Sequence, residues 1–175
     1  MKHRILLVLL LLSVAIIAPV AADSQIDIGI NVPVAIRFSF EGEQVSERLP
    51  FYIPVPDLMF NYYFTDSPVK LGVGARVWTL ILITGAYPIA SVEYESDRLL
   101  LNAHIGGGVF GYLTPVPEYS GIETGRVFLP EISAAYRFTD WFSLGAAVLG
   151  VWVPDLTEDR GMGYLFNVIG RFRVR

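Results

Sequence analysis

The sequence predicts an all-β protein, an eight-stranded antiparallel up-and-down transmembrane β-barrel that follows a cleaved signal peptide. Three observations predict it. The 175 residues are 53% hydrophobic and only 17% charged. After residue 22, no apolar stretch approaches the ~20 residues of a membrane-spanning helix. Apolar and polar residues instead alternate with a period of two, which is typical of strands whose two faces meet different surroundings.

The composition excludes several classes of protein. Disordered chains are polar and poor in aromatic residues, whereas 13% of this chain is aromatic. Because the chain has no cysteine, it forms no disulfide scaffold, no cysteine-ligated metal site and no acylated lipoprotein anchor. The excess of 17 acidic over 13 basic residues argues against nucleic acid as a partner.

The first segment has the three parts of a secretory signal peptide. Two basic residues precede the apolar run 5–17, and Ala22 is a small residue suited to a signal-peptidase site. We therefore expect a signal peptide, 1–22, and an outer-membrane barrel domain, 23–175. An uncleaved membrane anchor is the alternative, but the apolar run is short for a membrane span.

Eight segments of the mature chain show the alternation. They cover residues 26–40, 58–64, 69–77, 88–95, 99–106, 128–138, 142–148 and 164–173. In the first segment every even residue from Ile26 to Phe40 is apolar, and the odd positions carry polar or small residues such as Asp27. Eight is the smallest common number of strands in a membrane barrel.

The expected connections alternate in length. Short turns are predicted at 65–68, 96–98 and 139–141, and longer acidic connections at 41–50, 113–126 and 154–161, with 84–86 as a short connection on the second side. Short turns at one end and long loops at the other are typical of barrels in the bacterial outer membrane. We therefore expect both termini on the periplasmic side, and outer-membrane lipid as a partner.

Aromatic residues of the apolar phase gather at two levels. The turn-side level comprises Tyr62, Phe64, Tyr94, Tyr136, Phe138, Phe142 and Phe172, and the loop-side level comprises Phe38, Phe40, Phe128, Trp152 and Tyr164. Two such levels indicate the interfacial girdles of a membrane barrel. A soluble barrel such as a lipocalin also alternates and is the alternative, but it would carry charged residues on this uniformly apolar face.

Two strand–turn–strand units carry a family resemblance. One reads Tyr-Tyr-Phe-Thr-Asp at 62–66 with Leu-Gly at 71–72, and the other reads Tyr-Arg-Phe-Thr-Asp at 136–140 with Leu-Gly at 144–145. In these units, and in its general pattern over 25–175, the chain resembles the small eight-stranded outer-membrane proteins of the A, W and X types. The resemblance implies the barrel-assembly machinery as a partner, although the chain ends in arginine rather than the family's usual aromatic residue.

The side chains that we expect to point into the barrel are charged near the short turns. The candidate polar network comprises Asp27, Lys70, Arg76, Glu93, Glu95, His104, Glu131, Arg137, Arg171 and Arg173. Symmetric hairpins would place Arg76 opposite Glu95, and alignment of the chain ends would place Asp27 near Arg171. Side chains fill the interior of a barrel of this size. The network is therefore either an ion-paired plug in a non-conducting barrel or a narrow polar exit route.

Near the long loops, the side chains that we expect to point into the barrel are apolar. The candidate ligand pocket comprises Trp78, Leu80, Leu82, Phe110, Tyr112, Leu129 and Val151. These side chains either fill a dry core or line a site for a small hydrophobic molecule. An apolar upper lumen resembles that of the W type, which is associated with such molecules.

Three prolines, Pro33, Pro54 and Pro56, fall on the first two expected strands. Proline donates no hydrogen bond to a sheet, and a closed barrel has no edge on which to place it. Our hypothesis is that the wall is weakened there and opens laterally into the outer leaflet. A local bulge near a loop is the alternative.

The chain carries no evident catalytic motif. His104 is the only histidine of the mature chain, and Ser91 is expected across the strand pair from it. The serine two residues from the histidine that is typical of lipid A deacylase barrels is missing. We therefore predict no enzyme, no cofactor and no metal site.

The sequence favours a porin-like transport function, as a small pore or carrier for small, apolar molecules. The alternative is a non-conducting structural or adhesion-type barrel. Its partners would meet the acidic loop residues, which are Glu41, Glu43, Glu47, Glu118, Glu123, Asp155, Glu158 and Asp159.

Overall fold

The computed structural model describes residues 23–40, 43–49, 52–65, 67–80, 82–153 and 162–174. The expected signal peptide, the expected loop 154–161 and the C-terminal Arg175 lie outside these ranges. Within them, no helix is both long enough and apolar enough to cross a membrane.

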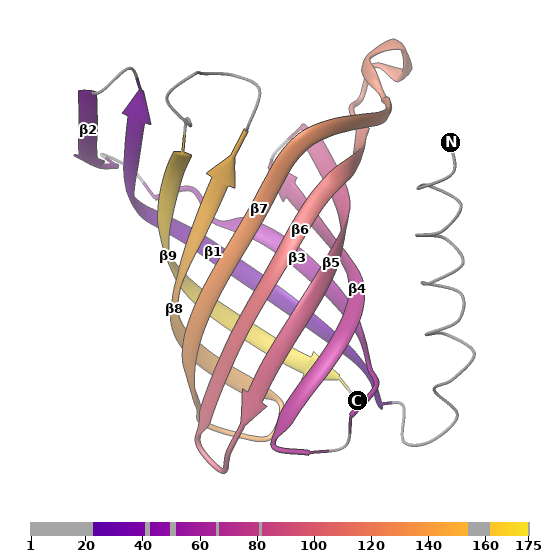
Figure 1. Ribbon diagram of the computed structural model, residues 1–175, viewed down its shortest axis with the longest axis vertical. Helices are drawn as coiled ribbons and strands as arrows, with labels where there is room; N and C mark the ends of the chain where they lie inside the picture. Colours follow the sequence, from indigo (N-terminus) through magenta and orange to yellow (C-terminus); the bar gives the residue numbers. More distant parts are fainter. Residues whose placement is uncertain are drawn as a thin grey trace.

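Antiparallel strands make up nearly all of the described chain. They are β1 (Asp23–Phe40), β2 (Glu43–Arg48), β3 (Val55–Tyr63), β4 (Val69–Leu80), β5 (Ile83–Glu95), β6 (Leu99–Leu113), β7 (Gly121–Arg137), β8 (Phe142–Trp152) and β9 (Met162–Val174), with a single 3-10 turn, η1 (Pro117–Tyr119). Strands from β3 to β9 pair in chain order, and β1 pairs with both β3 and β9, which closes the sheet. Figure 1 shows the strands strongly tilted, as closure of a small barrel requires.

β2 and β3 occupy one place in the wall. β1 pairs with β3 from Asp23 to Asn31, and with β2 from Ala35 to Phe40. The closed wall therefore has eight strand positions, which confirms the predicted fold class.

The short turns lie where the sequence predicts them. They connect β3 to β4, β5 to β6 and β7 to β8 at one end of the barrel, which we call the turn end (Figure 1). In both copies of the Thr-Asp motif the threonine hydroxyl accepts a backbone hydrogen bond: Thr65 from the Leu71 N–H at 2.9 Å, and Thr139 from the Phe142 N–H at 3.0 Å. The motif is therefore a turn-forming device, which explains its repetition.

The connection from β4 to β5 differs from the prediction. Leu80 pairs with Ile83, so the chain reverses between these two residues and the predicted turn 84–86 belongs to β5. Gly85 instead lies opposite Trp78, and a Cβ atom at Gly85 would come 2.5 Å from the Trp78 ring. A glycine that makes room for an indole cannot be distinguished in the sequence from a turn glycine, because both positions need the absence of a side chain.

Two predicted loops contain strands. The segment 41–50 includes β2, and β7 begins at Gly121 inside the predicted loop 113–126. β6 and β7 continue their pairing to Tyr112 opposite Gly121, which produces a hairpin that rises above the wall at the other end of the barrel, the loop end (Figure 1). The long connection is therefore a paired hairpin with a short tip rather than an irregular loop.

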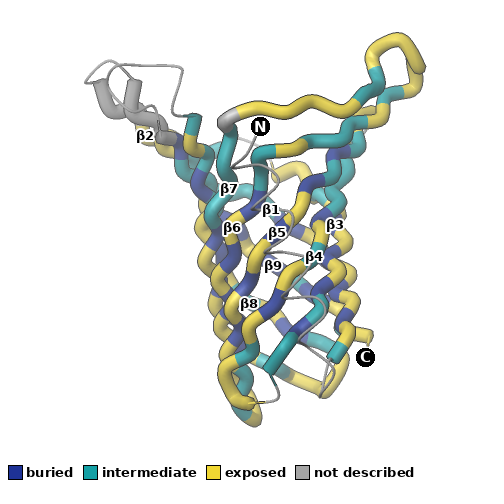
Figure 2. The backbone as a smooth tube through the Cα atoms, turned by 45° about the vertical axis from the view of Figure 1, so that its right-hand side comes forward, coloured by how far each residue is buried: buried dark blue, intermediate teal, exposed yellow. Residues whose placement is uncertain are grey.

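The two faces of the wall invert the pattern of a soluble protein. Along β3, Met59, Asn61 and Tyr63 are at most 1% exposed inside the barrel, whereas Leu58 and Phe60 are 42% and 45% exposed outside. Figure 2 shows the same alternation along the other strands. Buried Asp, Glu and Arg inside and exposed Leu, Val, Ile and Phe outside are what a bilayer requires of a closed barrel.

Aromatic rings line the turn end on the outer face. The Tyr136 and Phe138 ring centroids are 4.9 Å apart, and Phe172 packs on Phe142 at 5.1 Å and on Trp141 at 5.7 Å. At the loop end, the Phe128 and Trp152 ring centroids are 5.4 Å apart. Together with the apolar outer face, the short turns and the tall hairpin, these girdles place the protein in the outer membrane of a didermic bacterium.

The even-numbered residues of β1 are predicted to face outward as far as Phe40, and this prediction does not hold at Ile36. The register with β9 shifts between Pro33 and Ala35, so that Ile36 lies opposite Leu165, an inward residue. At this β-bulge Ile36 moves to the inward face, because one extra residue in a strand exchanges its faces. The predicted girdle residues Phe38 and Phe40 come after the bulge, and their side chains lie outside the described part of the structure.

Candidate functional site

The lower lumen, near the turn end, holds a layer of ion pairs. Arg173 donates from Nε to Asp27 Oδ1 at 2.8 Å and from Nη2 to Glu93 Oε2 at 2.8 Å. Lys70 lies 3.2 Å from Glu95. Arg137 also pairs with Glu95, and it donates to the carbonyls of the neighbouring turn. The predicted proximity of Asp27 to Arg171 is wrong, because the register of β1 with β9 places Asp27 opposite Arg173.

A second layer lies above the first. Arg76 binds Asp57 at 2.8 Å and Glu131 at 2.7 Å, and Arg171 donates to the other Glu131 oxygen at 3.1 Å. The predicted pairing of Arg76 with Glu95 is wrong, because the β4–β5 register, in which Leu80 pairs with Ile83, places Arg76 opposite Tyr87.

The two layers fill the lower lumen with paired charges. Glu93, Glu131 and Arg76 are 0%, 1% and 4% exposed. Burial of an ion is unfavourable unless a partner and hydrogen bonds compensate for the lost water, and here each of these three groups has at least two charged or polar partners. Of the two interpretations drawn from the sequence, this arrangement favours the plug.

His104 belongs to this second layer. Its Nε2 lies 3.2 Å from Arg76 Nη1, and its Nδ1 lies 3.2 Å from Asn102 Oδ1. An arginine can only donate, so Nε2 is the acceptor and Nδ1 carries the proton. Ser91 lies opposite His104 as predicted, but its hydroxyl donates to Asn61 at 2.7 Å. The arrangement is that of a structural histidine, and no group of metal-ligating side chains occurs among the described residues.

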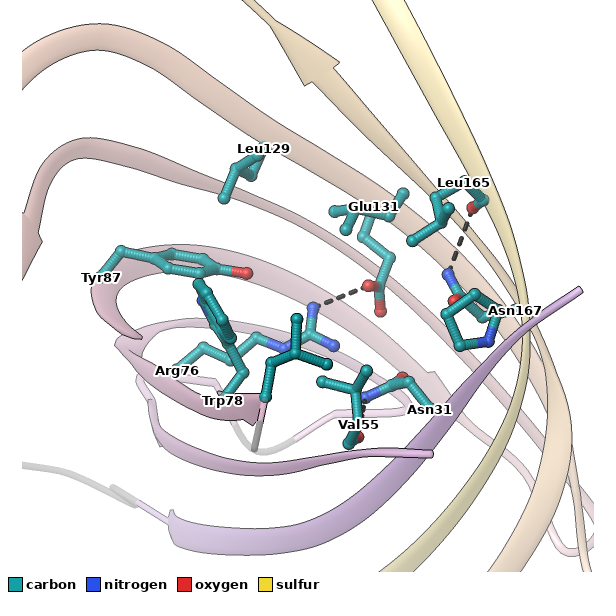
Figure 3. A pocket seen from close by; sticks show the side chains of 12 residues that line it. Asn31, Val55, Arg76, Trp78, Tyr87, Leu129, Glu131, Leu165 and Asn167 are labelled. Carbon is teal, nitrogen blue, oxygen red and sulfur yellow. Dashed lines mark hydrogen bonds and ion pairs between the residues drawn. The ribbon is translucent and has the colours of Figure 1, made fainter. Parts of the chain in front are cut away.

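Above the second layer the lumen opens into a cavity of about 280 Å³ (Figure 3). Its walls are largely apolar and include Val55, Trp78, Tyr87, Leu129, Leu149 and Leu165. Its polar side comprises Asn31, Arg76, Glu131 and Asn167. On its strand, each of these polar residues lies nearer the turn end than an apolar residue of the cavity wall. The Arg76–Glu131 ion pair is therefore the floor of the cavity.

The predicted pocket residues are only partly brought together. Trp78, Leu80 and Leu129 line the cavity. Leu82 is 65% exposed in the β4–β5 turn, and Phe110 packs on Tyr87 with ring centroids 5.7 Å apart.

The remaining two lie elsewhere. The Tyr112 hydroxyl donates to Glu123 at 3.1 Å in the tall hairpin, and Val151 lies on β8 two positions beyond the lining residue Leu149. Tyr87 is absent from the predicted pocket residues, because a turn at 84–86 ends just before it. With Leu80 paired to Ile83, the alternation itself places Tyr87 inside.

The cavity reaches the wall at Pro33. Pairing of β1 with β3 ends at Asn31 opposite Val55, and pairing with β2 begins at Ala35. Pro33 lies between the two ladders and lines the cavity. Pro56 lies opposite Ile30, just below the break. Pro54 precedes β3 and is exposed.

All ten predicted network residues are therefore together in the two layers, and the three prolines lie near one interruption of the wall. Of the acidic loop residues, Glu47, Glu118 and Glu123 are exposed. Glu43 lies in β2, and Glu41, Asp155, Glu158 and Asp159 lie outside the described residues.

No family model and no curated protein matches the chain. Among solved structures, the chain is similar to Neisserial surface protein A at 11% identity, which covers 88% of this chain and 98% of that one with a TM-score of 0.48. It is also similar to the outer membrane enzyme PagL at 12% identity, 83% and 98% coverage and a TM-score of 0.44. The attachment invasion locus protein Ail of Yersinia pestis has 16% identity, 86% and 97% coverage and a TM-score of 0.41.

Proposed function

We propose that the barrel is a carrier that takes a small, mainly apolar molecule into the upper-lumen cavity and releases it sideways through the wall at Pro33. One observation carries this proposal: an apolar cavity that is floored by a closed ion pair, Arg76–Glu131, and bordered by an interrupted strand ladder. Such a cavity has the composition of a ligand site, with apolar walls and a few polar groups.

Passage along the barrel axis is disfavoured by the two ion-pair layers. A molecule moving from the cavity toward the turn end meets Arg76 and Glu131 first, and then the group around Arg173. To separate buried partners would expose unpaired charges to a low-dielectric interior, which is strongly unfavourable. We therefore expect a carrier rather than an open pore.

The wall beside Pro33 offers the alternative route. Among the described residues, the backbone contact on the β2 side between Asn31 and Ala35 is one hydrogen bond, from the Leu49 N–H to the Val34 carbonyl at 3.2 Å. A wall held by few ladder bonds separates at lower free energy than a continuous ladder. The outer face here is the lipid-facing one, so an apolar molecule that leaves through the wall enters the bilayer directly.

Trp78 provides a direct test, because it lines the cavity. With Trp141→Phe and Trp152→Phe, Trp78 is the only tryptophan left of the three in the chain. We expect 1-bromonaphthalene to quench Trp78 saturably in lipid nanodiscs. Leu149→Phe, which narrows the cavity, is expected to weaken quenching at least tenfold, a discrimination of about 1.4 kcal/mol.

Val148→Phe is the matched control, because Val148 is the neighbouring residue on β8 and lies on the outer face. It is expected to leave the quenching unchanged. Linear, non-saturating quenching that is the same in all three proteins would show that the probe acts from the bilayer, and would exclude the cavity as a binding site.

A second candidate function is surface interaction through the tall hairpin. Val116 and Tyr119 at its tip are 46% and 68% exposed, and Ile122 at the start of β7 is 79% exposed. The exposed carboxylates of Glu118 and Glu123 lie beside them in the chain. Replacement of 114–120 by a short Gly-Ser turn is expected to abolish binding to a surface partner while Trp78 quenching persists. Retained adhesion of cells carrying the shortened hairpin would remove this candidate.

A further inference from the structure

We propose that the cavity selects apolar molecules that carry one neutral hydrogen-bond donor, such as a hydroxyl, and that Asn167 recognises this donor. The inference rests on the proposed function, since it names the class of molecule that the cavity holds. Its starting point is an unsatisfied group. Asn167 lines the cavity and is 4% exposed, and its Oδ1 is buried without a hydrogen-bond partner among the described residues.

The neighbouring Leu165 determines how the Asn167 amide is oriented. Asn167 Nδ2 donates to the Leu165 carbonyl at 3.2 Å, as the dashed line in Figure 3 shows. A carbonyl can only accept, so the nitrogen must face Leu165 and the oxygen must point away from it. The terminal torsion of asparagine is soft, which would allow Oδ1 to turn toward a bound donor.

A buried acceptor without a donor is unfavourable, and a ligand that supplies the donor removes this penalty. A pure hydrocarbon leaves Oδ1 unsatisfied. A hydroxyl satisfies it and keeps the rest of the molecule apolar. Recognition of this kind discriminates strongly, because the analogue that lacks the hydroxyl leaves the polar group of the protein unpaired.

The charges around the cavity disfavour an ionised head group. Arg76, the cation that lines the cavity, already binds Asp57 at 2.8 Å and Glu131 at 2.7 Å. Glu131 also receives Arg171 at 3.1 Å. A carboxylate would find this arginine occupied and a second acceptor, Asn167 Oδ1, beside it. An ammonium would lose its hydration to meet a carboxylate that is already neutralised.

The side of the cavity opposite Asn167 is suited to bind the apolar part of such a molecule. Figure 3 shows Trp78 and Tyr87 across the cavity from Asn31 and Asn167. The volume of about 280 Å³ is at the small end of ligand sites, so it favours a body the size of two fused rings. The polar group then lies against β9 and the rings lie against β4 and β5.

Three matched probes test this selectivity: naphthalene, 2-naphthol and 2-naphthoate at neutral pH. Each competes with 1-bromonaphthalene for quenching of Trp78 in nanodiscs that contain the Trp141→Phe, Trp152→Phe protein, with empty nanodiscs correcting for partition into lipid. We expect 2-naphthol to compete at about tenfold lower concentration than naphthalene, and 2-naphthoate to compete least.

Asn167→Leu removes the acceptor at similar volume, and it is expected to abolish the preference for 2-naphthol while naphthalene still competes. Asn31→Leu is the matched control, because Asn31 lines the same cavity but its amide donates to the Val55 carbonyl. It is expected to retain the preference. Heat-modifiable migration on a gel, together with retained naphthalene competition, shows that each variant is folded.

Equal competition by 2-naphthol and naphthalene, strongest competition by 2-naphthoate, or a preference that survives in Asn167→Leu would overturn this inference and leave cavity binding intact. Absence of saturable Trp78 quenching by 1-bromonaphthalene would instead overturn the proposed function, and the selectivity inference with it.

Discussion

Asp27 and Arg173 join the first and last strands of the barrel from inside, with Arg173 Nε 2.8 Å from Asp27 Oδ1. They lie opposite each other in the β1–β9 register, where the sheet closes. The same guanidinium reaches Glu93 on β5, so that one side chain ties the closure to the far wall.

Arg173→Ala is therefore expected to destabilise the barrel. It leaves the Asp27 and Glu93 carboxylates buried without this cation, and loss of one partner from a buried group of this kind costs about 3–5 kcal/mol. Urea unfolding in lipid vesicles, followed by tryptophan fluorescence, measures the change. Arg98→Ala is the control: Arg98 is exposed and donates to Tyr136 at 2.9 Å, so its loss is expected to change the unfolding free energy by less than about 1 kcal/mol. Equal effects of the two variants would contradict the structural role of Arg173.

Replacement of three glycines in β6 and β7 by alanine is expected to lower the stability of the barrel by different amounts. Gly107 has φ +115°, and an added Cβ would lie 2.2 Å from the Val127 carbonyl oxygen, whereas Gly108 has φ +78° and open space around it. Gly107→Ala is expected to lower stability by about 2 kcal/mol or more, because strain and a backbone clash combine. Gly108→Ala is expected to cost about 1–2 kcal/mol for the left-handed conformation alone.

Gly125→Ala completes the series, because an added Cβ at Gly125 meets nothing within 4 Å. Its effect on the unfolding free energy is expected to stay within about 0.5 kcal/mol. The same urea titration ranks the three variants. Any order other than Gly107, Gly108, Gly125 would show that this part of the wall relaxes around the new methyl groups.

Ion flux separates a carrier from a pore. We expect vesicles that contain the protein to release potassium no faster than protein-free vesicles, because the layers around Arg76 and Arg173 fill the lumen. A potassium-selective electrode measures the release, and a porin of larger diameter serves as the positive control. Discrete single-channel currents in a planar bilayer would contradict the plug and restore the axial route.

The proposed sideways route depends on the prolines at the break in the wall. Pro33→Val combined with Pro56→Val restores two N–H donors beside the cavity and is expected to strengthen the ladder there. Transfer of N-phenylnaphthylamine from water into vesicles that contain this variant is expected to slow toward the protein-free rate. Pro130→Val is the control, because Pro130 lies opposite Ile105 on β6 and does not line the cavity. An unchanged transfer rate in the double variant would remove the lateral route.

Local signals in the sequence were sufficient to predict the strands of the barrel wall and the face on which their side chains lie. The alternation of Leu58, Phe60 and Asn61 assigns each side chain to a face, since successive residues of a strand point in opposite directions. The Thr65 and Thr139 turns were also predictable, because each depends on residues within a few positions in the chain.

The ion-pair partners required the tertiary structure. Arg76 was expected near Glu95 and binds Asp57 and Glu131 on two other strands. The error came from the β4–β5 turn, where Gly85 makes room for Trp78. Displacement of one turn changes every cross-strand neighbour in the hairpin, so partners cannot be read from alternation alone.

The sequence by itself thus determined that the chain forms a barrel with apolar side chains outside and charged side chains inside, because a period of two is a local property of each strand. Only the tertiary structure decided that Asn167, Tyr87 and Pro33 meet around one cavity. Their meeting depends on the register of β1 with β9 and of β4 with β5, and register is a relation between strands far apart in the chain.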